Sequence, residues 1–180
     1  FSFKRRMREF NRKISGRQLS DLAVFKIEPE DETPLVEAIE LLISTAATVD
    51  AAFYIMAKNL RPGMRENDLQ GVVANELHRL GAQWVINIQM TSGSRTHPHP
   101  HLSSDRIIQP GDLVFADIVT MINGYHTCYY RTLCCGKPTQ EQKDIYNRTY
   151  EMLQRGIEQC IPGNTTADIC NAWPSAEYWG

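Results

Sequence analysis

The chain has 180 residues, 42% of them apolar, which is enough sequence for one domain with a real hydrophobic core. Its net charge of −2 gives no support for nucleic acid or an anionic membrane surface as a partner. The five cysteines show no metal-ligand spacing. An odd number without a disulfide framework favours a reducing, cytoplasmic location.

Residues 1–28 are predicted to form a basic linker or tail. Residues 1–18 carry seven Lys or Arg against one Glu, with Met7, Phe10 and Ile14 at helical spacing. Contact with nucleic acid or lipid head groups is one interpretation, and a solvated linker from a preceding N-terminal domain is the one we favour, because the rest of the chain is mildly acidic. The segment LAVFKI at 22–27 is a candidate strand. A start at Phe1 and a stop at Gly180 are expected of a fragment.

Two helices and a strand are predicted next. The first helix begins at Thr33 and Pro34 and ends near Asn59, and its three acidic residues argue against a membrane span. Its apolar positions recur every three or four residues: Leu35, Ile39, Leu42, Ala46, Val49 and Phe53. A second helix covers about 66–80 and ends at Gly81. A strand over 84–90 would place Trp84, Ile86, Ile88 and Met90 on one face.

The strongest local signal is a hairpin centred on Asn123-Gly124. LVFADIVTM alternates as a strand does, and YHTCYYRTL returns. A two-residue turn sets Val119 opposite Cys128 and Asp117 opposite Tyr130, on the face that also carries His126. An acid and a thiol then meet on one face. A buried Cys acting as a small hydrophobe beside a locally hydrogen-bonded Asp is the alternative, and spacing alone leaves both open.

A histidine tract precedes this hairpin. His97, His99 and His101 alternate with Pro98 and Pro100, and each proline drives the residue before it into extended conformation. Such a loop is stiff, which suits an imidazole held at a reacting centre. The alternative is a surface polyproline-like loop with solvated histidines. For His126, a packed or hydrogen-bonding role is favoured over catalysis.

Helices are predicted again after the hairpin. Thr139 and Gln142 form a capping box for a helix that runs to about Cys160, and a short helix starts at Thr165. The long helix would turn four apolar residues inward: Ile145, Met152, Leu153 and Ile157. The order of elements predicts an α+β fold, an antiparallel sheet covered by helices on one face.

Five ordered blocks, RPGMREND, the His-rich segment with DRIIQPGDLVFADI, GYHTCYYRT, GKPTQEQ and IPGNTTADI, carry a resemblance over roughly residues 30–170. They resemble the creatinase/methionine aminopeptidase/prolidase family of the "pita-bread" fold. The resemblance implies that residues 29–180 are the N-terminal half of a catalytic domain. It also implies a hydrolase of C–N bonds, peptide or amidine-type, in a small substrate or short peptide, of Xaa-Pro aminopeptidase or creatinase type. Alternatives are a non-catalytic binding protein of this fold and a lyase acting on dimethylsulfoniopropionate.

The resemblance also implies site residues. Asp117 falls where the peptidases place their first metal-binding Asp, and Cys128, eleven residues on, replaces the second, bridging Asp. A Cys thiolate can bind zinc or iron but cannot bridge two hard ions as a carboxylate does. The cofactor is therefore a divalent metal ion (Mn, Co, Fe or Zn), or the mechanism is metal-free as in the creatinase branch. The substrate-facing histidine maps to His99, with His101 second.

The remaining family residues, a His and two Glu, belong to the second half of the domain. Downstream of Thr132 this chain has no His. We therefore expect the 180-residue chain alone to be inactive. Family members often pair, so a homodimer is expected for the full-length protein.

Overall fold

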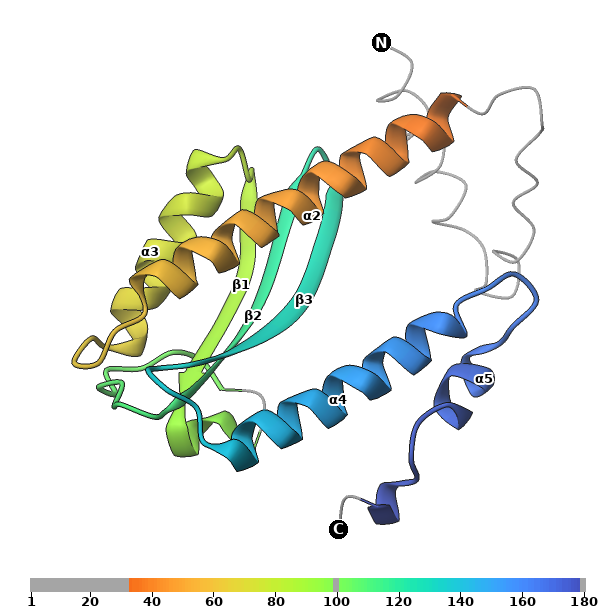
Figure 1. The fold of residues 1–180 in the computed structure, drawn as a ribbon. Coiled ribbons are helices and arrows are strands. Elements are labelled where there is room, and N and C mark those ends of the chain that lie inside the picture. Colours follow the sequence, from red (N-terminus) through yellow and green to blue (C-terminus); the bar gives the residue numbers. More distant parts are fainter. Residues whose placement is uncertain (1–32, 99–100, 179–180) are drawn as a thin grey trace.

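A computed structural model describes residues 33–98 and 101–178, and Figure 1 shows how their elements are arranged. Two helices come first, followed by a three-stranded sheet and then two further helices. In chain order the elements are α2 (Thr33–Asn59), α3 (Glu66–Arg79), β1 (Trp84–Ser92), the 3₁₀ turn η2 (Gly93–Thr96), β2 (Leu113–Ile122), β3 (Tyr125–Cys134), α4 (Gln140–Glu158), α5 (Thr166–Asn171) and the 3₁₀ turn η3 (Ala176–Tyr178). The basic segment 1–28 and the strand predicted at 22–27 lie outside the described residues.

The sheet is antiparallel, with β2 in the centre between β1 and β3. The predicted hairpin register is confirmed: Val119 pairs with Cys128, and Asp117 pairs with Tyr130. Asn123 and Gly124 both have positive φ, 51° and 87°, as a two-residue hairpin turn of this type requires. The turn chemistry written in two residues therefore sets which side chains share a face.

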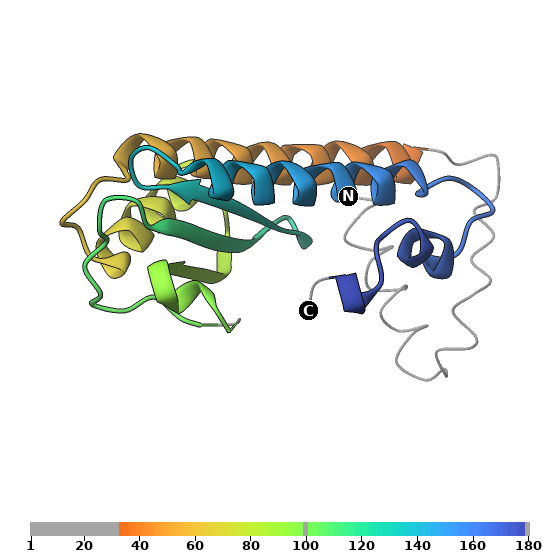
Figure 2. The ribbon, with the colours of Figure 1, turned by 60° about the horizontal axis from the view of Figure 1, so that its bottom comes forward.

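One face of the sheet packs on α2 and α3. Alternate residues of β2 are fully buried there: Val114, Ala116, Ile118 and Thr120. To the same core, α2 contributes Val49, Ala52 and Met56, and α3 contributes Leu69, Val73 and Leu77. The opposite face carries the intervening residues of β2 and β3, and Figure 2 shows the ribbon of the sheet and its helices from a second side. This arrangement confirms the predicted α+β fold with helices on one face.

The alternation predicted for β1 is wrong at its start. The register shifts between Val85 and Asn87, so Trp84 pairs with Met121 while Ile88 pairs with Ile118. Trp84 and Ile86 are exposed, whereas Ile88 and Met90 lie in the core. A β-bulge adds one residue to the strand, and one extra residue moves everything before it to the other face.

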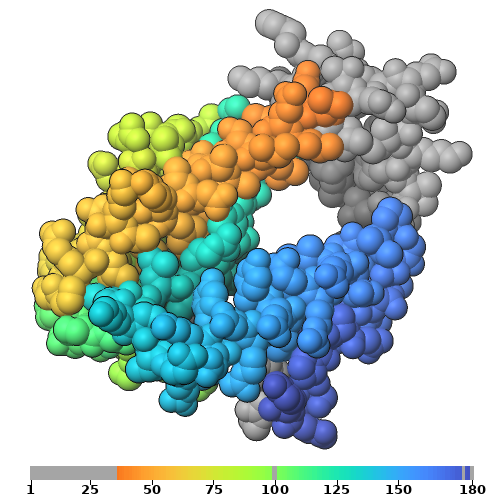
Figure 3. All heavy atoms as spheres, in the orientation of Figure 1, coloured from red at the N-terminus to blue at the C-terminus, as the bar shows by residue number. Residues whose placement is uncertain are grey.

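The inward face predicted for α4 is also not buried. Ile145, Leu153 and Ile157 are about half exposed. The helix runs away from the sheet after its capping box and meets α5, where the Trp173 indole nitrogen donates to the carbonyl of Met152. Figure 3 shows open space between α2 and α4. The apolar stripe of α4 is real, but the described residues do not cover it.

The first turns of α2 are exposed in the same way. Val36, Ile39, Leu42 and Ile43 are exposed, and burial begins around Thr45. By length and composition alone, Val36–Asn59 is long and apolar enough to cross a membrane. Its second half instead belongs to the core between the sheet and α3.

Candidate active site

The open face of the sheet brings Asp117 and Cys128 together. The Cys128 thiol donates a hydrogen bond to Asp117 Oδ1 with a sulfur–oxygen distance of 3.3 Å. Asp117 is only 5% exposed, while Cys128 is exposed at the surface of β3. The two residues are diagonal neighbours across β2 and β3, one pleat apart on the same face. Of the two alternatives for this pair, the buried-cysteine one is therefore wrong, although the Asp is held by a local hydrogen bond.

The electrostatics of the pair keep the thiol protonated. Partial desolvation of the sulfur, together with the hydrogen bond to Asp117 and the charge of that carboxylate, raises the pKa of Cys128. The charge of Asp117 and that of the Cys128 thiolate raise the pKa of the neighbouring Tyr130 phenol as well. A protonated thiol is a weak nucleophile and a poor metal ligand, so this pair at neutral pH is an acid–thiol contact.

Polar side chains from β1 complete this face. Gln89 pairs with Asp117 across the β1–β2 ladder, and Asn87 pairs with Val119. Gln89 Oε1 is buried and has no hydrogen-bond partner within the part of the chain that the structure describes. A buried amide oxygen without a donor is an unusual feature, and it lies beside the acid that sequence reasoning singled out.

The histidines that the structure describes differ in burial. His97 is exposed where η2 ends, and His101 is half-buried. His99 lies outside the described residues. His126 is exposed near the turn of the hairpin, opposite Met121, on the face of Asp117. Both His97 and His101 belong to the segment that joins η2 to β2.

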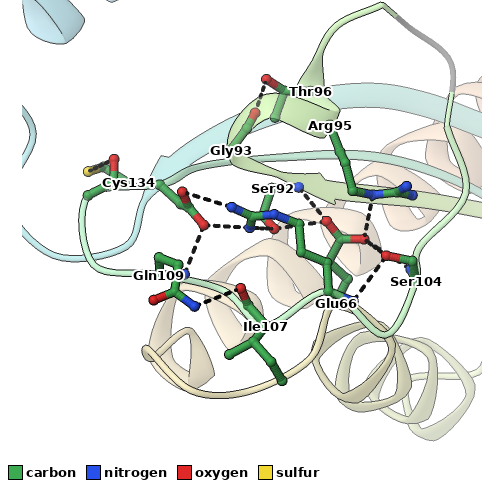
Figure 4. Close-up of polar contacts among 12 residues, drawn as sticks. Glu66, Ser92, Gly93, Arg95, Thr96, Ser104, Ile107, Gln109 and Cys134 are labelled. Atoms are coloured by element: carbon green, nitrogen blue, oxygen red, sulfur yellow. Dashed lines mark hydrogen bonds and ion pairs between the residues drawn. The ribbon is translucent and has the colours of Figure 1, made fainter.

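A buried polar network, which sequence reasoning missed, anchors this segment. Its centre is Glu66, in the first turn of α3, which is fully buried and contacts Ser92 and Ser104 (Figure 4). In the sequence, an acid in the first turn of a helix is explained by the helix dipole alone. Nothing local to RENDL indicates partners 26 and 38 residues away.

The comparisons with known proteins decide the family. The sequence profile of metallopeptidase family M24 matches residues 40–176. The chain belongs to this family. The resemblance drawn from the five sequence blocks is thereby confirmed.

Individual relatives agree with the family. The chain is 27% identical to the Xaa-Pro dipeptidase of Pyrococcus furiosus, over 94% of this chain and 46% of that protein. It is 30% identical to the Xaa-Pro dipeptidase of Lactobacillus helveticus, over 74% of this chain and 37% of that protein. The solved prolidase from Pyrococcus furiosus superposes with a TM-score of 0.72 at 27% identity, covering 84% of this chain and 43% of that one. The chain thus spans less than half the length of these relatives.

The family name implies a metal ion, and the open face of the sheet offers two candidate ligands for it. Asp117 and Cys128 lie close enough to bind one ion together. Within residues 33–98 and 101–178, however, no group of three or more His, Cys, Asp or Glu side chains could hold a metal. A thiol also cannot bridge two hard ions. The described residues by themselves therefore do not fit a metal site of the bridged, two-ion kind.

Proposed function

We propose that the full-length protein hydrolyses the C–N bond of short peptides, as an enzyme of the Xaa-Pro dipeptidase and aminopeptidase type. Residues 29–180 would form the N-terminal half of its catalytic domain. The observation that supports this proposal is the Asp117–Cys128 pair, which lies on the face of the sheet opposite the helices α2 and α3 in a chain of family M24. We further propose that the protein is cytoplasmic and forms a homodimer. Light scattering on the purified protein would test the dimer.

The roles proposed for the residues follow from their chemistry. His99, or else His101, would move a proton between water and the leaving nitrogen, because imidazole is the side chain whose charge changes near neutral pH. Asp117 would orient a donor group of the substrate or of water. Together with ligands from the rest of the full-length protein, Asp117 would hold a divalent ion, which would supply Lewis-acid chemistry. Cys128, protonated and hydrogen-bonded to Asp117, would hold that carboxylate in place.

Activity of the full-length protein tests the proposal. We expect turnover of Xaa-Pro dipeptides or of longer peptides with proline in the second position. Creatine and dimethylsulfoniopropionate serve as comparison substrates for the other branches of the resemblance. Asp117→Asn should lower kcat by about 10²-fold or more, as loss of a positioned catalytic carboxylate does. Turnover of creatine or dimethylsulfoniopropionate in place of peptides would refute the peptidase assignment.

The same preparation shows whether a metal takes part. Divalent metal in stoichiometric amount, with activity lost on chelation and restored by added Mn²⁺ or Zn²⁺, supports a metal-assisted reaction. Full activity after chelation supports the histidine-only route.

A second candidate is a non-catalytic member of the family. The hydrogen bond from Cys128 favours it, since that bond gives the Asp117 carboxylate a partner without any metal. Cys128→Asp separates the two functions. If the substitution confers metal binding and peptidase activity on an inactive protein, the non-catalytic assignment is correct. If it abolishes an existing activity, the thiol belongs to a working site.

A further inference from the structure

A single carboxylate closes the base of the histidine segment. Glu66 Oε1 accepts hydrogen bonds from the backbone nitrogen of Ser92 at 2.7 Å and from its hydroxyl at 2.8 Å. Glu66 Oε2 accepts from the backbone nitrogen of Ser104 at 3.0 Å and from its hydroxyl at 2.8 Å. Ser92 ends β1 and Ser104 follows His101, so the two oxygens hold opposite ends of one loop (Figure 4).

Two arginines make further contacts between the two sides of the loop. Arg95 Nε forms an ion pair with Glu66 Oε2 at 3.3 Å, and Arg95 Nη2 donates to the carbonyl of Leu102 at 2.7 Å. Arg106 donates to the hydroxyl of Ser92 and forms an ion pair with Asp112. The loop is thus crossed at its base and halfway along by charge-assisted hydrogen bonds, which are the stronger kind.

The carboxylate itself is held by the core. Glu66 is fully buried, with 0% of its surface accessible to solvent. Its helix is anchored by Leu69, Val73 and Leu77, which are also fully buried. A buried charge is costly unless every oxygen is paired, and within residues 33–98 and 101–178 every partner of the Glu66 carboxylate belongs to the histidine segment or its flanks. The helix therefore transmits the rigidity of the core to a surface loop.

We propose that Glu66 is a positioning residue that fixes both ends of the segment carrying His97 and His101. This proposal rests on the proposed function in one respect only, namely that the histidine segment faces the substrate. Placement of the loop and use of the loop can be measured separately.

Glu66→Gln in the full-length protein is the decisive variant. An amide keeps one acceptor oxygen and replaces the other with a donor, so the backbone N–H of either Ser92 or Ser104 loses its acceptor. We expect amide hydrogen exchange in 93–98 and 101–104 to accelerate at least about tenfold, since hydrogen bonds to a charged group are lost. Exchange in the hairpin strands β2 and β3 should stay unchanged. If the segment faces substrate, kcat falls by about 10²-fold while KM changes less, because misplaced catalytic groups cost that much.

Glu76→Gln is the matched control, because Glu76 lies on the same helix and forms an ion pair with Arg79, which does not contact the histidine segment in the described part of the chain. It should leave exchange and kcat unchanged. Ser104→Ala is the second variant, should Glu66→Gln fail to fold. It removes the hydroxyl that donates to Glu66 and accepts from the backbone nitrogen of Arg106, and it should accelerate exchange in 101–106 with little effect at 93–98.

The outcomes distinguish the two proposals. Exchange that rises equally in β2 and β3, or nowhere, overturns the positioning role and makes Glu66 an ordinary core residue. Exchange that rises only in the segment, with kcat unchanged on an active enzyme, supports the positioning role and overturns the placement of these histidines in the active site.

Discussion

Replacing Cys128 with aspartate would place a second carboxyl group next to Asp117. The sulfur lies 3.3 Å from Asp117 Oδ1, so the two carboxyl groups would lie within about 4 Å of each other. At an effective dielectric constant of about 20, two charges at that distance repel by about 4 kcal/mol. Proton uptake limits this cost, and water around the exposed position screens it further. We therefore expect a loss of about 1–2 kcal/mol in metal-free buffer at pH 8.

The sign of the pH dependence follows from the repulsion. It raises the pKa of the introduced carboxyl in the folded state above its unfolded value of about 3.9. The penalty is therefore absent below about pH 4, and it grows as the pH rises through the folded pKa. A divalent ion between the two carboxylates would reverse the effect. Because the ion binds the folded state, Mn²⁺ or Zn²⁺ should raise the Tm of the variant and change that of the unaltered protein less.

Thermal unfolding of the full-length protein at pH 4.5 and pH 8, with and without metal, measures both effects. A loss of 1–2 kcal/mol at pH 8 corresponds to a Tm lower by about 1–3 °C in a protein more than twice as long as this chain. Cys170→Asp is the matched control, because Cys170 is exposed on α5 and lies outside the hairpin. A Tm offset that is equal at both pH values and insensitive to metal would show that positions 117 and 128 do not interact and do not belong to one site.

Three further substitutions test individual contacts. Tyr129→Phe removes bonds to the Ala46 carbonyl at 2.9 Å and to an α2 carboxylate, and should cost about 1–2 kcal/mol in chemical denaturation, whereas the exposed Tyr54→Phe should cost nothing measurable. Gly93→Ala should destabilise by about 1–3 kcal/mol in the same assay, because φ is +55° and a Cβ would lie 2.5 Å from a guanidinium nitrogen. Asp117→Asn should lower the pKa of Cys128 and accelerate its alkylation by iodoacetamide at pH 8; an unchanged rate would refute the pKa argument.

The parts of the site that the sequence predicted are those set by local chemistry. Asn123-Gly124 fixes a two-residue turn, and the turn fixes which residues of β2 and β3 face each other. Since side chains alternate along both strands, Asp117 and Cys128 follow onto one face without further information. The capping box at Thr139 and Gln142 is confirmed for the same reason, because both of its bonds form within four residues.

Where the sequence failed, the missing information was tertiary. The apolar periodicity of α4 predicts which of its residues favour burial, but not which element covers them. In the described part of the chain, α4 lies away from the sheet. The bulge in β1 is invisible in WVINIQM, because Trp84 and Ile86 continue the apolar alternation of Ile88 and Met90 as they would in a strand without a bulge. A one-residue slip of that kind costs the pattern little and changes the face of Trp84 completely.

Glu66 shows why a site can be half predicted. Sequence reasoning finds groups that carry chemistry, such as the histidines and the acid–thiol pair, because their residue types are unusual where they stand. It misses the residue that places them, because a first-turn glutamate is ordinary and its partners are distant in sequence. A catalytic side chain on a surface loop is only as precise as the contacts at the loop's ends. Here both ends of the histidine segment contact the buried carboxylate of Glu66. The placement of the histidines therefore depends on a residue that takes no part in the proposed reaction itself.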